Sequence, residues 1–349
     1  MISALKTYQT LLEQILVNPS NGSPIKIEIN GDNCNLICSV SKQIVGSLNK
    51  GVIEFSNQKL ANNAEKEQTI EMFGHEWQQY SNWGWLDQLP DEKNAELSFQ
   101  GGLRKNSKKA LFSKTRTNPN DYKDKIVLEG GCGNGRHSQF AKEGTKLLIS
   151  IDPSVAIYEA AKNLEKNENI IFIKASLLNL PFAENTFDLI FSIGVLQHTG
   201  DPEKVLSEIS RCLKPSGTFG LNCYGRGYWP YEILDHILRS FITRWSRERQ
   251  LKFAENIASF SIFLVKNNLN FLYKIIMFFI NINPSKCIMY DWYSPSLADH
   301  YSRKKLKGWF DKYGFLTIDS NIEINRFTIK YLRQKLNHSA FNMKLKRKP

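Results

Sequence analysis

A regular alternation of short apolar runs and amphipathic runs, which starts at residue 125, most constrains what this chain can fold into. The apolar runs are nearly continuous in Val, Ile, Leu and Phe, as is typical of parallel strands covered on both faces. Segments of helical length separate them. The pattern predicts an α/β fold with a doubly wound, mostly parallel sheet. The predicted strands are KIVLEG, LLISID, IIFIKAS, FDLIFSIG and TFGLNC.

The turn after the first predicted strand is rich in glycine. That strand ends at Glu129, and Gly131, Gly133 and Gly135 lead into the next helix. Glycines at such a turn permit positive φ angles and let the backbone approach a ligand closely. Asp152 closes the second strand, where a carboxylate can accept hydrogen bonds from both hydroxyls of a ribose. A nucleotide-like ligand is therefore expected at this edge of the sheet.

A nicotinamide dinucleotide is the first competitor for this turn, and the glycine spacing argues against it. Its fingerprint is GxGxxG, and counting from Gly131 puts Arg136 at the third glycine position. Glu129 also stands before the glycines, where it would repel a pyrophosphate and attract an amino group. The spacing ExGxGxG favours a different nucleotide-like ligand.

These residues resemble the class I S-adenosylmethionine-dependent methyltransferases. The stretch LPFAENTFDLIFSIGVLQHTGDPEKVLSEISRCLKPSG, residues 180–217, is similar to the fourth-strand region of the small-molecule, type 11-like branch of that family. The resemblance implies a Rossmann-like sheet of seven strands, S-adenosyl-L-methionine as the cofactor, and methyltransferase activity.

The resemblance also implies roles for the residues of the first turn. Glu129 is expected near the methionine amino group of the cofactor. The three glycines, Gly131, Gly133 and Gly135, are expected around its methionine and ribose. Asp152 would bind the ribose hydroxyls.

Residues after the later strands would complete the site. Ser176 stands where the family often has an acid that faces the adenine amino group, and Leu177 and Ile193 are expected to line the adenine pocket. His198, in GVLQHTGDP, follows the fourth strand, where the acceptor should meet the methyl group. Either this imidazole takes a proton from the acceptor, or it caps the next turn and packs under the cofactor. No metal is expected.

The regions outside these motifs suggest four parts. Residues 1–100 are expected to form an N-terminal extension, in which a leader that looks like a degenerate zinc ribbon precedes an aromatic helix. The aromatic cluster FGHEWQQYSNWGW is expected to cap a core, and a ligand-facing wall is the alternative. Residues 101–224 and 296–336 would form the methyltransferase core, and residues 225–295 a helical substrate lid. Residues 337–349 are expected to be a frayed, solvated basic tail.

Positive charge is concentrated near the C-terminus. Residues 301–349 hold 13 Lys and Arg against three Asp and Glu, which accounts for +10 of the formal net charge of +12. The rest of the chain is nearly neutral, so a DNA-binding body is not expected. Scattered cysteines and the lack of a secretory signal at the start indicate a reducing, cytoplasmic setting.

The expected reaction is methyl transfer to an oxygen, nitrogen or carbon atom of a small-molecule or lipid-like acceptor. One alternative is an RNA (tRNA) methyltransferase that grips RNA with the basic C-terminal region. Another is a non-catalytic, methyltransferase-like binding subunit. The apolar stretch 257–282, interrupted by lysines, favours a buried helical pair; peripheral contact with a membrane or cover for a lipid-like substrate is the alternative.

Overall fold

The computed structural model describes residues 1–56, 58, 60–85, 104–322 and 340–349. Residues 86–103 and 323–339, which belong to the predicted extension, core and tail, lie outside this described part.

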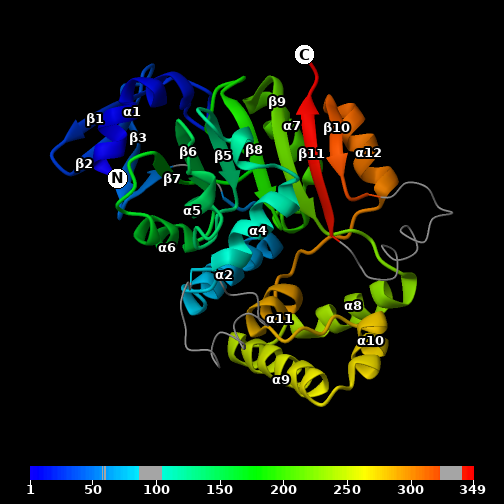
Figure 1. Cartoon of the computed structure of the whole chain (residues 1–349). Helices are drawn as coiled ribbons and strands as arrows, with labels where there is room; N and C mark the ends of the chain where they lie inside the picture. The colour runs from blue at the N-terminus through cyan, green and yellow to red at the C-terminus, as the bar shows by residue number, and fades with distance from the viewer. Residues whose placement is uncertain (57, 59, 86–103, 323–339) are drawn as a thin grey trace.

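The described strands form one sheet in the order β1-β2-β3-β4-β7-β6-β5-β8-β9-β11-β10, with helices against both faces (Figure 1). The strands are β1 (Ile25–Asn30), β2 (Asn33–Cys38), β3 (Ile44–Asn49), β4 (Val52–Phe55), β5 (Ile126–Gly130), β6 (Leu147–Ile151), β7 (Ile170–Lys174), β8 (Phe187–Ile193), β9 (Leu213–Cys223), β10 (Phe315–Ser320) and β11 (Phe341–Arg347). The helices are α1 (Ile2–Ile15), α2 (Ala64–Gln79), α4 (Arg104–Thr115), α5 (Ser138–Ala141), α6 (Ala156–Asn163), α7 (Pro202–Cys212), α8 (Trp229–Ile242), α9 (Arg247–Lys266), α10 (Asn270–Phe279), α11 (Lys286–Tyr293) and α12 (Arg303–Lys312).

The parallel core confirms the predicted doubly wound α/β sheet. β5 pairs in parallel with β6 on one side and with β8 on the other. The chain runs outward from β5 through β6 to β7 and then returns to β8 on the opposite side of β5. Such a reversal leaves a crevice at the carboxyl ends of the strands, where ligands of open α/β sheets bind. Every residue of β5 and β6 is buried, as expected for strands covered on both faces.

Two apolar layers hold the helices to the sheet. On one face α1, α7 and α12 contribute Leu5, Leu206 and Phe310 to the core. On the other face α4, α5 and α6 contribute Leu111, Phe140 and Ile157.

The described sheet has eleven strands rather than seven, because the N-terminal extension joins it. β1 to β4 form an antiparallel meander, and β4 then pairs in parallel with β7, with Val52 opposite Phe172. β4 is apolar and mostly buried, so it can cover the edge of β7. Cys34 and Cys38 lie buried on β2, and within the described residues no group of three or more His, Cys, Asp or Glu is placed to hold a metal ion.

The prediction of a frayed C-terminal tail is wrong. β11 lies between β9 and β10 and is antiparallel to both. Its apolar side chains Phe341, Met343 and Leu345 are buried, and Lys344 Nζ lies 2.7 Å from Asp121 Oδ1. The alternation of apolar and polar residues in FNMKLKR is the pattern of a strand, and the many basic side chains concealed it.

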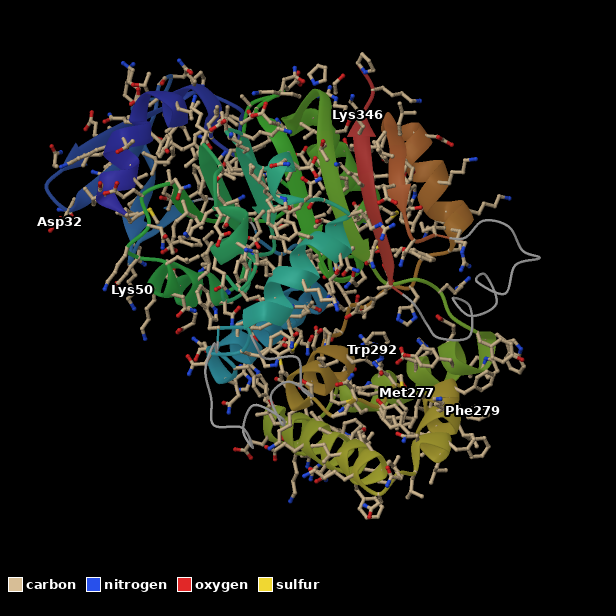
Figure 2. The ribbon with its side chains drawn as sticks, viewed as in Figure 1. Asp32, Lys50, Met277, Phe279, Trp292 and Lys346 are labelled. Atoms are coloured by element: carbon tan, nitrogen blue, oxygen red, sulfur yellow. The ribbon has the colours of Figure 1, made fainter. Side chains whose placement is uncertain are left out.

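Helices α8 to α11 occupy the region after β9 that was predicted to be a substrate lid; we call this helical region the lid, and its role toward a substrate stays a prediction. They lie below the carboxyl ends of the parallel strands in the view of Figure 1. Met72 of α2 packs with Ala258 of α9 and Tyr290 of α11, so α2 belongs to this unit as well. Trp292 lies on the side of the lid toward the sheet, and Phe279 at its outer margin (Figure 2).

The preferred interpretation of residues 257–282 as a buried helical pair is wrong for its second half. α9 buries one side, including Ala258 and Leu264, but no residue of α10 is buried. In the described part of the chain, no helix has the length and apolar character needed to cross a bilayer.

The packing of β11 yields a direct stability prediction. Met343→Ala should lower the free energy of unfolding by about 2 to 4 kcal/mol, because it removes a fully buried side chain from the sheet. Leu316→Ala, on the neighbouring strand β10, is the control: that side chain is 46% exposed, and the loss should be about 1 kcal/mol or less. Urea unfolding of both variants measures the difference, and equal losses would contradict the inserted position of β11.

Candidate active site

A cavity opens where the parallel strands end. Each of five neighbouring strands places a residue on its wall: Gly131 follows β5, Asp152 follows β6, Ser176 follows β7, Ile193 ends β8, and Asn222 lies near the end of β9. These segments are far apart in the sequence, and the sheet order alone brings them together.

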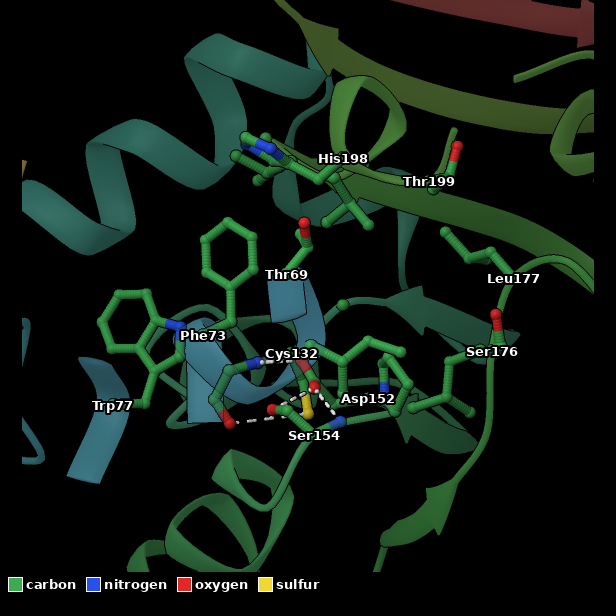
Figure 3. A pocket seen from close by; sticks show the side chains of 18 of the residues that line it. Thr69, Phe73, Trp77, Cys132, Asp152, Ser154, Ser176, Leu177, His198 and Thr199 are labelled. Carbon is green, nitrogen blue, oxygen red and sulfur yellow. Dashed lines mark hydrogen bonds between the residues drawn. The ribbon is translucent and has the colours of Figure 1, made fainter. Parts of the chain in front are cut away.

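Helix α2 closes the cavity from the side opposite Ser176. Thr69, Phe73 and Trp77 point into it from one face of the helix (Figure 3). α2 begins at Asn63, whose side chain accepts a hydrogen bond from the backbone N–H of Lys66. The sequence favoured a core-capping role for these aromatic residues, with a ligand-facing wall as the alternative, and Phe73 and Trp77 do line the cavity. The spacing of Phe73 and Trp77, four residues apart, was the available signal that both rings share a face.

The glycine turn lies directly under this helix. Gly131 and Gly133 have φ angles of +80° and +54°. A Cβ atom at Gly133 would lie 2.9 Å from Nε1 of Trp77, and one at Gly131 would lie 2.3 Å from a methyl group of Val195. Only glycine allows both the conformation and the close approach. Gly135, in contrast, packs against Ala160 of α6 and does not line the cavity.

Asp152 ties the glycine turn to the second strand. Its Oδ2 accepts a hydrogen bond from the backbone N–H of Gly133 at 3.0 Å. Its Oδ1 accepts from the backbone N–H and the hydroxyl of Ser154, at 2.9 and 2.6 Å. Burial raises the pKa of Asp152, while these three donors oppose the shift. A carboxylate offers about four lone-pair positions, so about one remains for a further donor in the cavity.

Glu129 lies behind the cavity wall, not on it. Its Oε2 accepts hydrogen bonds from the hydroxyls of Ser138, at 2.5 Å, and Ser150, at 2.8 Å. Burial raises its pKa to about 7, against the two hydroxyl donors. The Oε2 atom of Glu129 is therefore bonded to protein hydroxyls at the base of the glycine turn, and a role of this carboxyl toward a methionine amino group stays a prediction.

The residues predicted for the adenine side do line the cavity. Ser176 accepts a hydrogen bond from the backbone N–H of Leu178 at 3.2 Å, so its oxygen keeps one lone pair and its own proton. Leu177 and Ile193 add apolar surface beside it. Their roles toward a ligand stay predictions.

His198 lies on the wall between two aromatic rings. Its ring centroid is 4.8 Å from that of Phe73 and 5.6 Å from that of Tyr224. Nδ1 lies 2.5 Å from the carbonyl oxygen of Leu297, so it carries the proton and donates. Burial lowers the pKa of the imidazole to about 3. Nε2 is buried without a hydrogen-bond partner among the described residues, and its lone pair is free to accept.

Charged side chains gather at one end of the cavity. Lys114, Arg136 and Asp291 all line it, yet no ion pair joins them within the described residues. The guanidinium carbon of Arg136 lies 4.9 Å from the Trp77 ring and 4.4 Å from the Trp83 ring. Burial and the nearby Arg136 lower the pKa of Lys114 to about 8, and burial raises the pKa of Asp291. Two cations against one acid leave this end suited to an anionic group.

Part of the chain matches a known protein family. Residues 128–221 match the family described as "Methyltransferase domain". The chain is 31% identical over 118 residues to a tRNA U34 carboxymethyltransferase of Desulfotalea psychrophila, a match that covers 32% of this chain and 37% of that protein. It is 34% identical over 102 residues to a sterol 24-C-methyltransferase of Schizosaccharomyces pombe, covering 27% and 26%. The matches thus span 37% and 26% of the length of these two relatives.

Among solved structures, similar chains include a putative sarcosine dimethylglycine methyltransferase from Galdieria sulphuraria. That likeness has a TM-score of 0.46 at 15% identity, and it covers 82% of this chain and 99% of the other. A phosphoethanolamine N-methyltransferase 2 from Haemonchus contortus has a TM-score of 0.42 at 16% identity, covering 72% and 54%.

The buried carboxyl of Glu129 predicts a pH-dependent stability. With its pKa raised to about 7, the folded protein holds this proton more tightly than the unfolded chain, so the free energy of unfolding falls as pH rises from about 4.5 to 7. Glu129→Gln removes this loss. The variant should exceed wild type by up to about 3 kcal/mol at pH 8 and by little at pH 5, measured by urea unfolding.

Glu143→Gln is the matched control: that side chain and its ion pair with Lys108 are exposed, so either value should change by no more than about 0.5 kcal/mol. A Glu129→Gln variant that is less stable than wild type at pH 8 would contradict the prediction, since it would show that the fold needs the ionised carboxylate.

Proposed function

We propose that this chain, in which residues 128–221 form a class I S-adenosylmethionine-dependent methyltransferase domain, transfers a methyl group to an oxygen, nitrogen or carbon atom of a small-molecule or lipid-like acceptor. The observation that carries the proposal is the convergence of Gly131, Gly133 and Asp152 on one cavity at the carboxyl ends of the parallel strands. The bound cofactor would supply an activated sulfonium methyl group, so no covalent enzyme intermediate is required. The protein's task is then to hold, align and shield the acceptor.

The residues on the wall fit this cofactor. The backbone at Gly131 and Gly133 has no side chains to exclude a ligand, and Asp152 retains acceptor capacity for a ribose hydroxyl. We assign the adenine side to Ser176, with Leu177 and Ile193 as its apolar neighbours. Glu129 acts indirectly here, and Gly135 serves the packing of the turn on α6.

His198 is the proposed orienting group for the acceptor. Its neutral Nε2 can accept a hydrogen bond from an acceptor hydroxyl or amine, while the bond from Nδ1 to Leu297 fixes the ring. With a pKa of about 3, the imidazole is too weak a base to store the released proton. His198 would therefore align the acceptor, and solvent would take the proton.

The cavity wall beyond the strand ends supports an amphiphilic acceptor. Phe73, Trp77 and Tyr224 supply aromatic surface, and Lys114 with Arg136 supplies positive charge. Such a lining suits a molecule with an apolar body and an anionic group.

The RNA alternative draws its support from relatives whose name is tRNA U34 carboxymethyltransferase. Against it, the basic residues of β11 belong to a strand of the sheet, and Lys344 is paired with Asp121. These three of the 13 basic residues in 301–349 therefore belong to the sheet and not to a free arm. A non-catalytic binding subunit would differ from both by lacking affinity for the cofactor.

Calorimetric titration with S-adenosylmethionine and S-adenosylhomocysteine tests the proposal first. Wild type should bind both, and Asp152→Ala should weaken binding by about 10- to 100-fold, because a charge-assisted hydrogen bond is lost. Glu143→Ala, an exposed carboxylate, is the control and should bind as wild type does. Absence of binding by wild type would sink the proposal. Saturable binding of bulk tRNA that weakens steeply with salt would instead favour the RNA alternative.

Nuclear magnetic resonance of imidazole nitrogens tests the state of His198. With selectively labelled histidine, and His198→Asn to assign the signal, His198 should remain neutral with the proton on Nδ1 from pH 8 down to pH 5. Burial excludes the charged form, which is the reason for this expectation. A titration near pH 6.5 would show that the group can serve as a general base.

A further inference from the structure

Large apolar side chains gather on the outer surface of the lid. In the described residues, twelve of the seventeen exposed large hydrophobic side chains lie between positions 229 and 279. These twelve define the lid apolar surface: Trp229, Ile233, Ile237, Phe241, Trp245, Phe260, Phe263, Leu269, Phe271, Leu272, Ile275 and Phe279. A concentration of exposed apolar side chains of this kind usually marks an interaction site.

Helix α8 is amphipathic, but it exposes its apolar side and buries charged residues. Its exposed apolar residues recur at every fourth position from Trp229 to Phe241, which places them in one stripe along the helix. Its charged residues Asp235 and Arg239 are buried on the other side. Asp235 accepts a hydrogen bond from the Trp292 indole at 2.8 Å. The water-facing side of α8 is thus its apolar side.

Helix α10 continues the same surface. It packs against α8 and α9 without burying a residue, and Phe271 at its start is 78% exposed. A chain of ring contacts joins the two helices. Tyr228 lies 6.0 Å from Trp229 and 5.2 Å from Phe278, which lies 5.1 Å from Phe279 (centroid distances; Phe279 is labelled in Figure 2).

Charge selects the kind of partner for this surface. Residues 257–285 contain Lys266 and Lys274 but no Asp or Glu. Neither lysine forms an ion pair within the described part of the chain. On α8, Glu232 is engaged by His300, with its Oε2 2.9 Å from Nδ1. The exposed face therefore combines Trp and Phe rings with lysines, the composition of helices that lie in a lipid–water interface.

We propose that α8 and α10 dock this protein on an anionic lipid bilayer, with the lid apolar surface among the acyl chains and Lys266 and Lys274 against lipid phosphates. A second copy of the chain fits this surface less well. A two-fold contact would bring these lysines toward their own copies, with no carboxylate on α10 to offset them. The proposal does not depend on methyl transfer. The lid that carries this surface also borders the cavity, because Trp292 of the lid stacks on Tyr224 of the cavity wall at 4.7 Å.

Vesicle flotation with the full chain tests the proposal. Wild type should float with vesicles of phosphatidylcholine and phosphatidylglycerol, and less with phosphatidylcholine alone. Phe271→Ser/Phe279→Ser should weaken partition of the protein into vesicles by about tenfold or more, because two rings that would insert among the acyl chains are lost. Lys266→Glu/Lys274→Glu should abolish the preference for phosphatidylglycerol vesicles and its dependence on salt.

Controls separate this result from folding and from the cofactor site. Ile44→Ser removes an exposed side chain from β3, far from the lid, and should float as wild type does. All variants should keep the wild-type circular dichroism spectrum and affinity for S-adenosylmethionine. Failure of membrane docking can therefore be distinguished from failure of the proposed methyltransferase function. The proposal is overturned if wild type stays off both kinds of vesicle, or if the Phe271→Ser/Phe279→Ser variant floats like wild type. It is also overturned if light scattering shows a dimer that this variant converts to monomer.

Discussion

The hydrogen bonds of the Asp152 carboxylate hold the cavity together. One oxygen accepts from the backbone of Gly133, in the turn after β5, and the other from Ser154, in the turn after β6. The two central strands are thereby tied at the edge where the chain reverses direction in the sheet. Because backbone groups are the main donors, the turn itself must hold its shape for the carboxylate to be satisfied.

The buried carboxyl groups at this edge of the sheet are stabilised by hydrogen-bond donors of the protein. Glu129 and Asp152 are both buried, and both accept hydrogen bonds from serine hydroxyls: Glu129 from Ser138 of α5 and Ser150 of β6, and Asp152 from Ser154 in its own turn. Without these donors, a buried carboxylate would cost several kcal/mol. The strand ends thus form a network whose parts stabilise one another, and Gly133, Asp152 and Ser154 belong both to this network and to the cavity wall.

Much of the central fold could be predicted from local pattern. Apolar runs and the glycine turn located the strands from residue 126 to residue 223, and the strand ends then placed Gly131, Asp152, Ser176 and Ile193 on one cavity. The position of α2 beside the cavity could not be predicted from the sequence, because nothing in the residues near Phe73 indicates which edge of a distant sheet the helix covers. The orientation of Glu129 was also out of reach. It depends on two serines, nine and twenty-one residues away, that complete its hydrogen bonds.

The position of β11 bears on the order in which this protein is built. β10 is synthesised first, yet in the described sheet it pairs only with β11 and has no direct bond to β9. β10 can therefore join the sheet only when residues 341–347 lie beside it. The same strand covers the backbone groups at the edge of β9, and unpaired strand edges are the sites at which chains associate wrongly. Displacement of β11 alone would thus expose two edges at once, one on β9 and one on β10.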